Sequence, residues 1–217
     1  MRAFHRRLAE LGLAATHRFG FALAGGYAVS EHGMGDRLSV DVDLFTDVVD
    51  PDSFRAAGDQ LRAAYEYEGL VVEVNRVGPV FLDLRVTDER TGESSDVQLG
   101  ANFREFPPRV LSVGPVLDPR DAVAGKMSAL WSRSEARDYI DIDTVISSGR
   151  FDREEVLALA DAQEALPLDR AMLAERFRGA RRHPAEVYAL YAVDAARRAE
   201  IVERFARWAD EIDPDRS

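Results

Sequence analysis

The fold is decided by two short stretches, GGYA at residues 25–28 and RLSVDVDLF at residues 37–45. In the second stretch polar and apolar side chains alternate, which predicts a β-strand over residues 39–45. Because successive side chains of a strand point to opposite faces, Asp41 and Asp43 would both project from the face opposite the apolar residues. A solvent-facing strand edge is the alternative explanation of this acidic pair.

Two carboxylates on one face repel each other, and a cation relieves that repulsion. Without a cation between them, their pKa values rise. Mg²⁺ prefers carboxylate and phosphate oxygens, and two such ions about 3.5–4 Å apart can activate an attacking hydroxyl and stabilise a leaving pyrophosphate. Asp41 and Asp43 therefore predict a Mg²⁺ site. Two ions are expected there, with Mn²⁺ as an alternative.

The Gly25-Gly26 pair supplies the other half of such a site. It lies between a predicted strand over residues 19–23 and a predicted short helix over residues 27–32. Backbone N–H groups and the helix dipole attract phosphate at such a junction, and glycine lets a phosphate approach the chain closely. A glycine pair alone is typical of a turn. Followed about fifteen residues later by the acidic pair, it predicts binding of nucleotide phosphates.

The rest of the pattern divides the chain into two predicted domains, residues 1–117 and 118–217. The first mixes helical and strand signals. It has predicted helices over residues 2–13 and 51–67, and predicted strands over residues 70–75, 80–87 and 94–99, of which the last two form a hairpin. From residue 118 onward almost every segment has a helical pattern.

Capping residues mark the helix starts of the second domain. Asp118 precedes a proline, which is typical of an N-cap followed by the first helical position. Asp152 and Glu155 have the spacing of a capping box, and Asp169 can cap the next helix. The last helix is expected to run without a break over residues 185–211.

Composition excludes several classes of protein. The 217 residues suffice for a sizeable core, and none is cysteine, so no disulfide, thiolate metal site or cysteine nucleophile is expected. No apolar run approaches the roughly 20 residues of a membrane span. The N-terminal segment favours a helix over a signal peptide, because it lacks a continuous apolar core that ends in a small-residue cleavage site. These features agree with a cytoplasmic protein that makes no membrane contact.

The net charge of −11 argues against sequence-independent binding of nucleic acid. A local basic run could still bind an RNA end, and its members are Arg176, Arg178, Arg181 and Arg182. The alternative is that these arginines form a solvated helical surface. Composition alone leaves both interpretations open.

Two blocks of the sequence resemble a known family. GGYAVSEHG and RLSVDVDLF, followed by KMSALWSRSEARDYIDI at residues 126–142, are similar to the motifs of the AbiEii/AbiGii toxin family, which includes MenT-type toxins. That family lies within the polymerase-β-like nucleotidyltransferase superfamily. The resemblance implies an α+β fold: a polymerase-β-like core with a small mixed sheet flanked by helices, followed by an all-helical C-terminal region.

The resemblance also implies roles for individual residues. Asp41 and Asp43 correspond to the metal-binding pair, while Ser39 and Arg37 would lie near the triphosphate. A surface salt bridge is the alternative for Arg37. Lys126 corresponds to the family's lysine.

Two arginines follow Lys126 in the sequence. Arg133 and Arg137 come seven and eleven positions later, which on one continuous helix would place all three cations on nearly the same face. Such a cationic stripe would suit a triphosphate.

Further carboxylates would complete the site. Asp96 is the first candidate for a third metal ligand that helps to take the proton from the acceptor, and Asp83 is the competitor. Asp138 and Asp141 match an Arg-Asp-x-x-Asp element. Asp141 is expected to contact the nucleotide or to orient Lys126. A helix cap or a buried ion pair is the structural alternative for either residue.

The expected activity is that of a nucleotidyltransferase. It would move a nucleoside monophosphate from a nucleoside triphosphate, such as ATP, to an acceptor hydroxyl and release pyrophosphate. The resemblance implies the toxin of a toxin–antitoxin pair, with the 3′ end of tRNA as acceptor and a cognate antitoxin as partner. Two alternatives remain open: nucleotidylation of a small antibiotic-type molecule, and a non-catalytic nucleotide-binding module.

Overall fold

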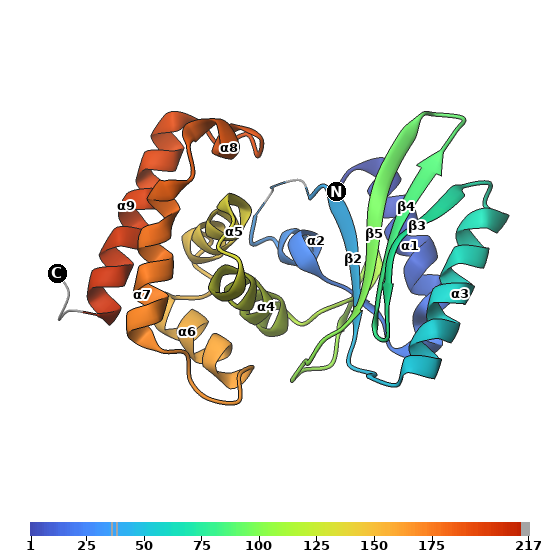
Figure 1. Ribbon diagram of the computed structural model, residues 1–217, viewed down its shortest axis with the longest axis horizontal. Helices are drawn as coiled ribbons and strands as arrows, with labels where there is room; N and C mark the ends of the chain where they lie inside the picture. The colour runs from blue at the N-terminus through green and yellow to red at the C-terminus, as the bar shows by residue number, and fades with distance from the viewer. Residues whose placement is uncertain (36, 38, 214–217) are drawn as a thin grey trace. The chain divides into compact units, whose positions relative to one another are not determined.

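The computed structural model describes residues 1–35, 37 and 39–213. The chain forms two compact units, which are described in turn. The first comprises Met1–His32 and Leu38–Ala122, and the second comprises Gly33–Arg37 and Val123–Ser217. The first unit is a mixed sheet with helices and the second is helical, so the predicted α+β class is confirmed (Figure 1).

The first unit is built on a seven-stranded sheet in the order β3-β4-β5-β2-β1-β7-β6. β2 pairs with β5, and β1 with β7, in parallel, whereas the other neighbours are antiparallel. The strands are β1 (Ala22–Leu23), β2 (Asp41–Thr46), β3 (Val71–Gly78), β4 (Phe81–Asp88), β5 (Glu93–Ala101), β6 (Arg109–Leu111) and β7 (Gly114–Val116).

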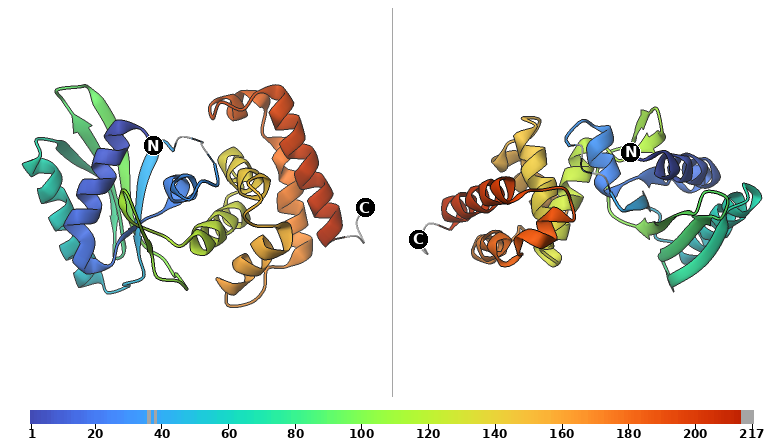
Figure 2. Two further views of the ribbon diagram at one scale, coloured as in Figure 1. Left: turned by 180° about the vertical axis from the view of Figure 1, so that it is seen from behind. Right: turned by 90° about the horizontal axis from the view of Figure 1, so that it is seen from above.

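Two helices, α1 (Ala3–Thr16) and α3 (Pro51–Tyr67), cover one face of this sheet (Figures 1 and 2). Beneath them lie fully buried side chains such as Val42 and Leu44 of β2. The packing is close at Gly12, where an added Cβ would lie 2.7 Å from Leu44 Cδ1. This apolar layer turns the opposite face of β2 and β5, which carries the aspartates, away from the core.

The second unit is formed by helices, and α4 reaches it from the first. Its elements are α4 (Pro119–Ser132), α5 (Ala136–Ser147), α6 (Arg153–Ala162), α7 (Arg170–Arg178), the 3₁₀ turn η2 (Gly179–Arg182), α8 (Ala185–Ala189) and α9 (Ala195–Ile212). Aromatic rings fill its centre: Phe177 lies 4.4 Å from Trp208 and 5.3 Å from Phe205 between ring centroids. Such offset and edge contacts bury large apolar areas.

A buried carboxylate joins α5 to α9 in this unit. Asp143 is 3% exposed and forms ion pairs with Arg197 and Arg204 of α9. A buried charge is tolerated only when it is paired in this way. Among the described residues, no helix has both the length and the apolar character that crossing a membrane requires.

Local sequence signals predicted several elements well. The helix expected over residues 51–67 is α3, whose N-cap Asp50 accepts a hydrogen bond from Ser53 N at 2.8 Å. Asp152 and Asp169 cap α6 and α7 as predicted.

The prediction of one unbroken helix over residues 185–211 is wrong. The chain turns between α8 and α9, where Ala192 has a φ of 60°, and Asp194 caps the new helix. The short strands β6 and β7 were not predicted, because three-residue segments carry too little alternation to be recognised.

Candidate active site

Asp41 and Asp43 lie on the same face of β2, as the alternation predicted. Burial along this strand alternates: Asp41, Asp43 and Phe45 are half-buried, and Val42, Leu44 and Thr46 are buried. In the parallel register with β5, Asp41 is opposite Asp96 and Asp43 is opposite Gln98. The acidic pair therefore projects from the sheet face that α1 and α3 leave uncovered.

The carboxylate of Asp43 lies directly against Gly25. A Cβ added to Gly25 would be 1.7 Å from Asp43 Oδ2, so no other amino acid fits here without displacing the carboxylate. Gly25 also has a φ of +60°, which favours glycine. It begins α2 (Gly25–Glu31), two residues earlier than predicted, and Gly26 is buried in the first turn. Figure 1 shows α2 beside β2, on the other side of the sheet from α1 and α3.

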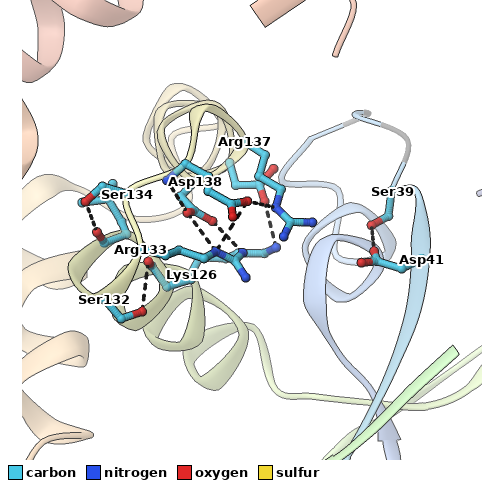
Figure 3. Close-up of polar contacts among 12 residues, drawn as sticks. Ser39, Asp41, Lys126, Ser132, Arg133, Ser134, Arg137 and Asp138 are labelled. Carbon is cyan, nitrogen blue, oxygen red and sulfur yellow. Dashed lines mark hydrogen bonds and ion pairs between the residues drawn. The ribbon is translucent and has the colours of Figure 1, made fainter. Parts of the chain in front are cut away.

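A hydrogen-bond chain orients the other aspartate. The Ser39 hydroxyl donates to Asp41 Oδ1 at 2.7 Å (Figure 3). The backbone carbonyl of Ser39 accepts a hydrogen bond from the Tyr27 hydroxyl at 3.2 Å, and that hydroxyl lies 2.6 Å from His5 Nδ1. Burial lowers the pKa of His5. Neither His5 nor Tyr27 was predicted to support the site, because sequence separations of 22 and 12 residues leave no local signal.

The two candidates for a third carboxylate are both engaged by cationic side chains. Asp96 Oδ1 lies 3.0 Å from Arg85 Nε and accepts a hydrogen bond from Asn75. Asp83 pairs with Arg76 at 3.3 Å and also accepts from Asn75. Within the part of the chain that the structure describes, no group of three or more histidine or acidic side chains is arranged to hold a metal ion. A third ligand therefore stays a prediction.

The acidic pair nevertheless suits a hard divalent cation. Its donors are carboxylate oxygens, which Mg²⁺ prefers, and Mg²⁺ is commonly held by one or two carboxylates together with substrate phosphates and water. Asp43 is fixed by the space at Gly25, and Asp41 is fixed by Ser39. Two oriented carboxylates on one strand face are thus sufficient protein ligands for such an ion.

A second charged cluster lies in the helical unit and centres on Asp141 of α5. Lys126 Nζ of α4 lies 2.8 Å from Asp141 Oδ2, and Arg37 makes a bidentate contact with both carboxylate oxygens at 2.6 and 2.9 Å. The side chain of Asp141 is 5% exposed and those of the two cations are 10% exposed. Arg37 also lies over the ring of Tyr191.

The electrostatics of this cluster keep Asp141 ionised. Burial acts to raise the pKa of Asp141, but the charge of Lys126 and the Arg37 guanidinium outweigh it and hold that pKa below its ordinary value. The carboxylate is therefore ionised and is shared by the two cations. The expectation that Asp141 orients Lys126 agrees with this contact.

Arg133 and Arg137 are arranged differently from the prediction. A single cationic stripe on one helix is wrong, because α4 ends at Ser132 and Arg137 belongs to α5. The break lies at Ser134, which has a φ of 53°. Figure 3 shows Lys126, Arg133 and Arg137 at this junction of the two helices.

Asp138 fastens that junction. It accepts a hydrogen bond from the backbone N–H of Glu135, in the manner of a helix cap, and from Arg133 at 2.8 and 3.1 Å. Its side chain is fully buried. The structural alternative given for Asp138, a cap and a buried ion pair, matches these contacts.

Comparisons with known proteins agree with this fold. A family model described as the nucleotidyl transferase AbiEii toxin of a type IV toxin–antitoxin system matches residues 8–215, which confirms the resemblance found in the sequence. MenT4, a nucleotidyltransferase toxin of Mycobacterium tuberculosis H37Rv, has a structure with a TM-score of 0.62 at 17% identity, over 98% of this chain and 85% of that one. JHP933 of Helicobacter pylori gives 0.55 at 15% identity, over 98% and 90%. These identities support the fold alone. No curated protein matches the sequence.

Proposed function

We propose that this chain, which belongs to the AbiEii family of nucleotidyl transferase toxins of type IV toxin–antitoxin systems, transfers a nucleoside monophosphate from a nucleoside triphosphate to the 3′ hydroxyl of a tRNA. Pyrophosphate leaves in the same step. The observation that carries the proposal is the Asp43 carboxylate seated against Gly25, on the strand face that it shares with Asp41.

Asp41 and Asp43 would hold Mg²⁺. When bound there, Mg²⁺ would neutralise phosphate charge and lower the pKa of the attacking hydroxyl. The chain's own contribution is orientation. Ser39 donates to one oxygen of Asp41 and so fixes the rotamer of that carboxylate, while the absence of a side chain at Gly25 leaves the space that Asp43 occupies. Because these carboxylates are already oriented, they need not reorganise during the reaction.

Lys126 and Arg37 would bind the triphosphate. The two cations share one carboxylate, and both the ammonium and the guanidinium group suit phosphate oxygens. Asp141 holds both cations in place before substrate arrives, which reduces the entropy lost on binding. Such chemistry depends on positioning and charge neutralisation rather than on a covalent intermediate.

The acceptor is proposed to be RNA because the helical unit carries arginine-rich surface despite the acidic net charge. Arg176, Arg181 and Arg182 are exposed around the end of α7 and η2. Such a surface would not contribute to the binding of a small antibiotic-type acceptor. Membership of a toxin family further supports a cellular nucleic acid as target, with a cognate antitoxin as partner in the system.

Radiolabelled transfer tests the proposal directly. Purified protein is incubated with Mg²⁺, each α-labelled nucleoside triphosphate in turn, and either total RNA or a panel of antibiotics. We expect label to enter the tRNA fraction and to depend on Mg²⁺. Label that enters only the small molecules would replace the RNA acceptor with the alternative substrate class.

Binding measurements separate the enzyme from a non-catalytic module. Calorimetric titration of each nucleoside triphosphate, with and without Mg²⁺, should show metal-dependent binding that Asp43→Asn weakens. Binding of a triphosphate without transfer to any RNA or antibiotic tested would favour the regulatory module.

A further inference from the structure

The helical unit contains a basic pocket separate from the Asp141 cluster. It has a volume of about 200 Å³ and lies where the end of α4, the start of α5 and the α7–η2 segment meet. We call it the arginine pocket. Its principal lining residues are Arg133, Tyr139, Arg176, Gly179, Arg182 and His183.

Positive charge predominates in the arginine pocket. Three arginines line it against one acidic residue, Glu175, which lies 3.6 Å from Arg178. Arg133 is held by Asp138, whereas Arg176 and Arg182 form no ion pair among the residues that the structure describes. Their charges extend into the pocket, since both act to lower the pKa of Tyr139 although burial raises it overall.

The floor of the pocket is rigid. The Tyr139 hydroxyl donates to the backbone carbonyl of Arg176 at 2.6 Å, and His183 Nε2 donates to the backbone carbonyl of Ser134 at 2.8 Å. Gly179 admits the tyrosine, because an added Cβ would lie 2.8 Å from its hydroxyl oxygen. These contacts fix the backbone from which Arg176 projects, so its guanidinium is presented from a defined position.

The size and the donors of the pocket select a single phosphate group. Guanidinium forks match phosphate oxygens in pairs of parallel hydrogen bonds. Pockets for drug-sized ligands occupy roughly 300–1,000 Å³. The arginine pocket, at about 200 Å³, is therefore too small for a whole nucleoside triphosphate. It can take one phosphodiester of a longer chain.

The distance to Lys126 favours a polymer. Arg133 follows Lys126 by seven positions and comes directly after the last residue of α4. At the rise of an α-helix, that separation corresponds to about 10 Å along the helix axis. A ligand that reacts near Lys126 and also reaches the pocket must therefore span at least this distance. A stretch of RNA, which carries phosphates in series, can do so and place one of them in the pocket.

We infer that the arginine pocket binds a backbone phosphate of the acceptor RNA and thereby sets the affinity for the acceptor. The inference rests on the proposed function, because it assigns part of the RNA's binding surface. Arg176 and Arg182 provide the two exposed guanidinium groups, and Arg133 contributes from the wall that Asp138 fixes.

The test compares the double variant Arg176→Gln/Arg182→Gln with Arg181→Gln. Arg181 is exposed in the same 3₁₀ turn but does not line the pocket, so twice the change in log KM caused by its removal estimates the effect of losing two nearby charges alone. We expect the double variant to raise the KM for RNA about tenfold more than the control does, with the KM for the nucleoside triphosphate unchanged. The salt slope of log kcat/KM should fall by about 0.7, the value for one phosphate contact on a single strand. A change in log KM no larger than twice that of Arg181→Gln would overturn the inference.

Direct binding keeps this test independent of catalysis. Fluorescence polarisation with labelled RNA and no nucleotide should show weaker binding by the double variant, and thermal melting should match wild type because both arginines are exposed. If RNA binding changes as expected but no RNA is ever labelled, the pocket stands and the proposed transfer fails. If inorganic phosphate at equal concentration competes with RNA as effectively as unlabelled RNA does, the site binds free phosphate and the RNA assignment fails.

Discussion

The acidic pair of the sheet and the cationic cluster of the helical unit are positioned in different ways. Asp41 and Asp43 are two positions apart on β2, and strand alternation alone puts them on one face. Lys126 and Asp141 come from different helices, and Arg37 is 104 residues from Asp141 along the chain, so only folding joins the three. Two carboxylates on one strand face are expected to repel each other, whereas removing the carboxylate of the cationic cluster would take away the ion pairs of two nearly buried side chains. Substitutions should therefore separate activity from stability.

The largest effect is expected for Asp43→Asn. Loss of a metal-binding carboxylate should lower kcat about 10³-fold, roughly 4 kcal/mol of transition-state stabilisation. The melting temperature should stay close to that of wild type, because asparagine nearly preserves the size of the side chain. Single-turnover transfer and calorimetry measure the two quantities. The matched control is Asp52→Asn on α3, because the side chain of Asp52 is 84% exposed. Full activity in Asp43→Asn would remove Asp43 from the mechanism.

Asp141→Asn should have its main effect on stability. Removing the carboxylate takes away the counterion that Lys126 and Arg37 share, and both side chains are nearly buried. Such a loss costs about 3 kcal/mol of unfolding free energy, which urea denaturation measures. Lys126→Met is the control: it leaves the bidentate Arg37–Asp141 pair intact and should lose activity with a smaller loss of stability. Equal destabilisation by both variants would contradict this account of the cluster.

The stability difference between wild type and Asp141→Asn should also depend on pH. The pKa of Asp141 is lower in the folded protein than in the unfolded chain. As the pH falls, the unfolded chain is therefore protonated at a higher pH than the folded protein. The stabilisation is therefore complete above the ordinary aspartate pKa of about 3.9 and is lost as pH falls through the folded value. The urea midpoints of wild type and Asp141→Asn should differ at pH 7 and should converge as the pH is lowered. A constant difference would show that the charge is not responsible.

Gly25→Ala should reduce transfer because the new Cβ takes the position of Asp43 Oδ2. We expect kcat to fall about 100-fold, roughly 2.7 kcal/mol of activation free energy. The positive φ at this position adds a backbone cost to folding of about 1–2 kcal/mol. Gly92→Ala separates the two effects, since Gly92 has a φ of +74° and no neighbouring atom within 4 Å of the added Cβ. We expect comparable destabilisation in the two variants but loss of transfer only at Gly25.

The smallest effect is expected for Ser39→Ala, because its hydroxyl orients only one oxygen of Asp41. Losing that hydrogen bond should lower kcat about tenfold, roughly 1.4 kcal/mol. Steady-state transfer assays measure the change against Ser132→Ala, whose hydroxyl bonds only to its own helix. A loss as large as that of Asp43→Asn would mean that Ser39 contacts the reacting groups itself.

How far each element could be predicted follows from the range of the interaction that forms it. α3 and the caps of α6 and α7 depend on neighbours close by in the sequence, and these were predicted correctly. The junctions at Ser134 and Ala192 were missed, because non-glycine residues there adopt positive φ without a glycine or proline to mark the turn.

The sequence by itself determined the strand that carries Asp41 and Asp43, because alternation is a local property of the chain. That Gly25 lies against the Asp43 carboxylate was decided by the fold. Tertiary structure alone decided that Arg37 pairs with Asp141, that Tyr27 holds Ser39, and that arginines from three segments line one pocket. The first two contacts arise because burial makes an unpaired charge or hydroxyl too costly, and burial is a property of the whole fold. The pocket arises because the fold brings together segments that are far apart in the sequence.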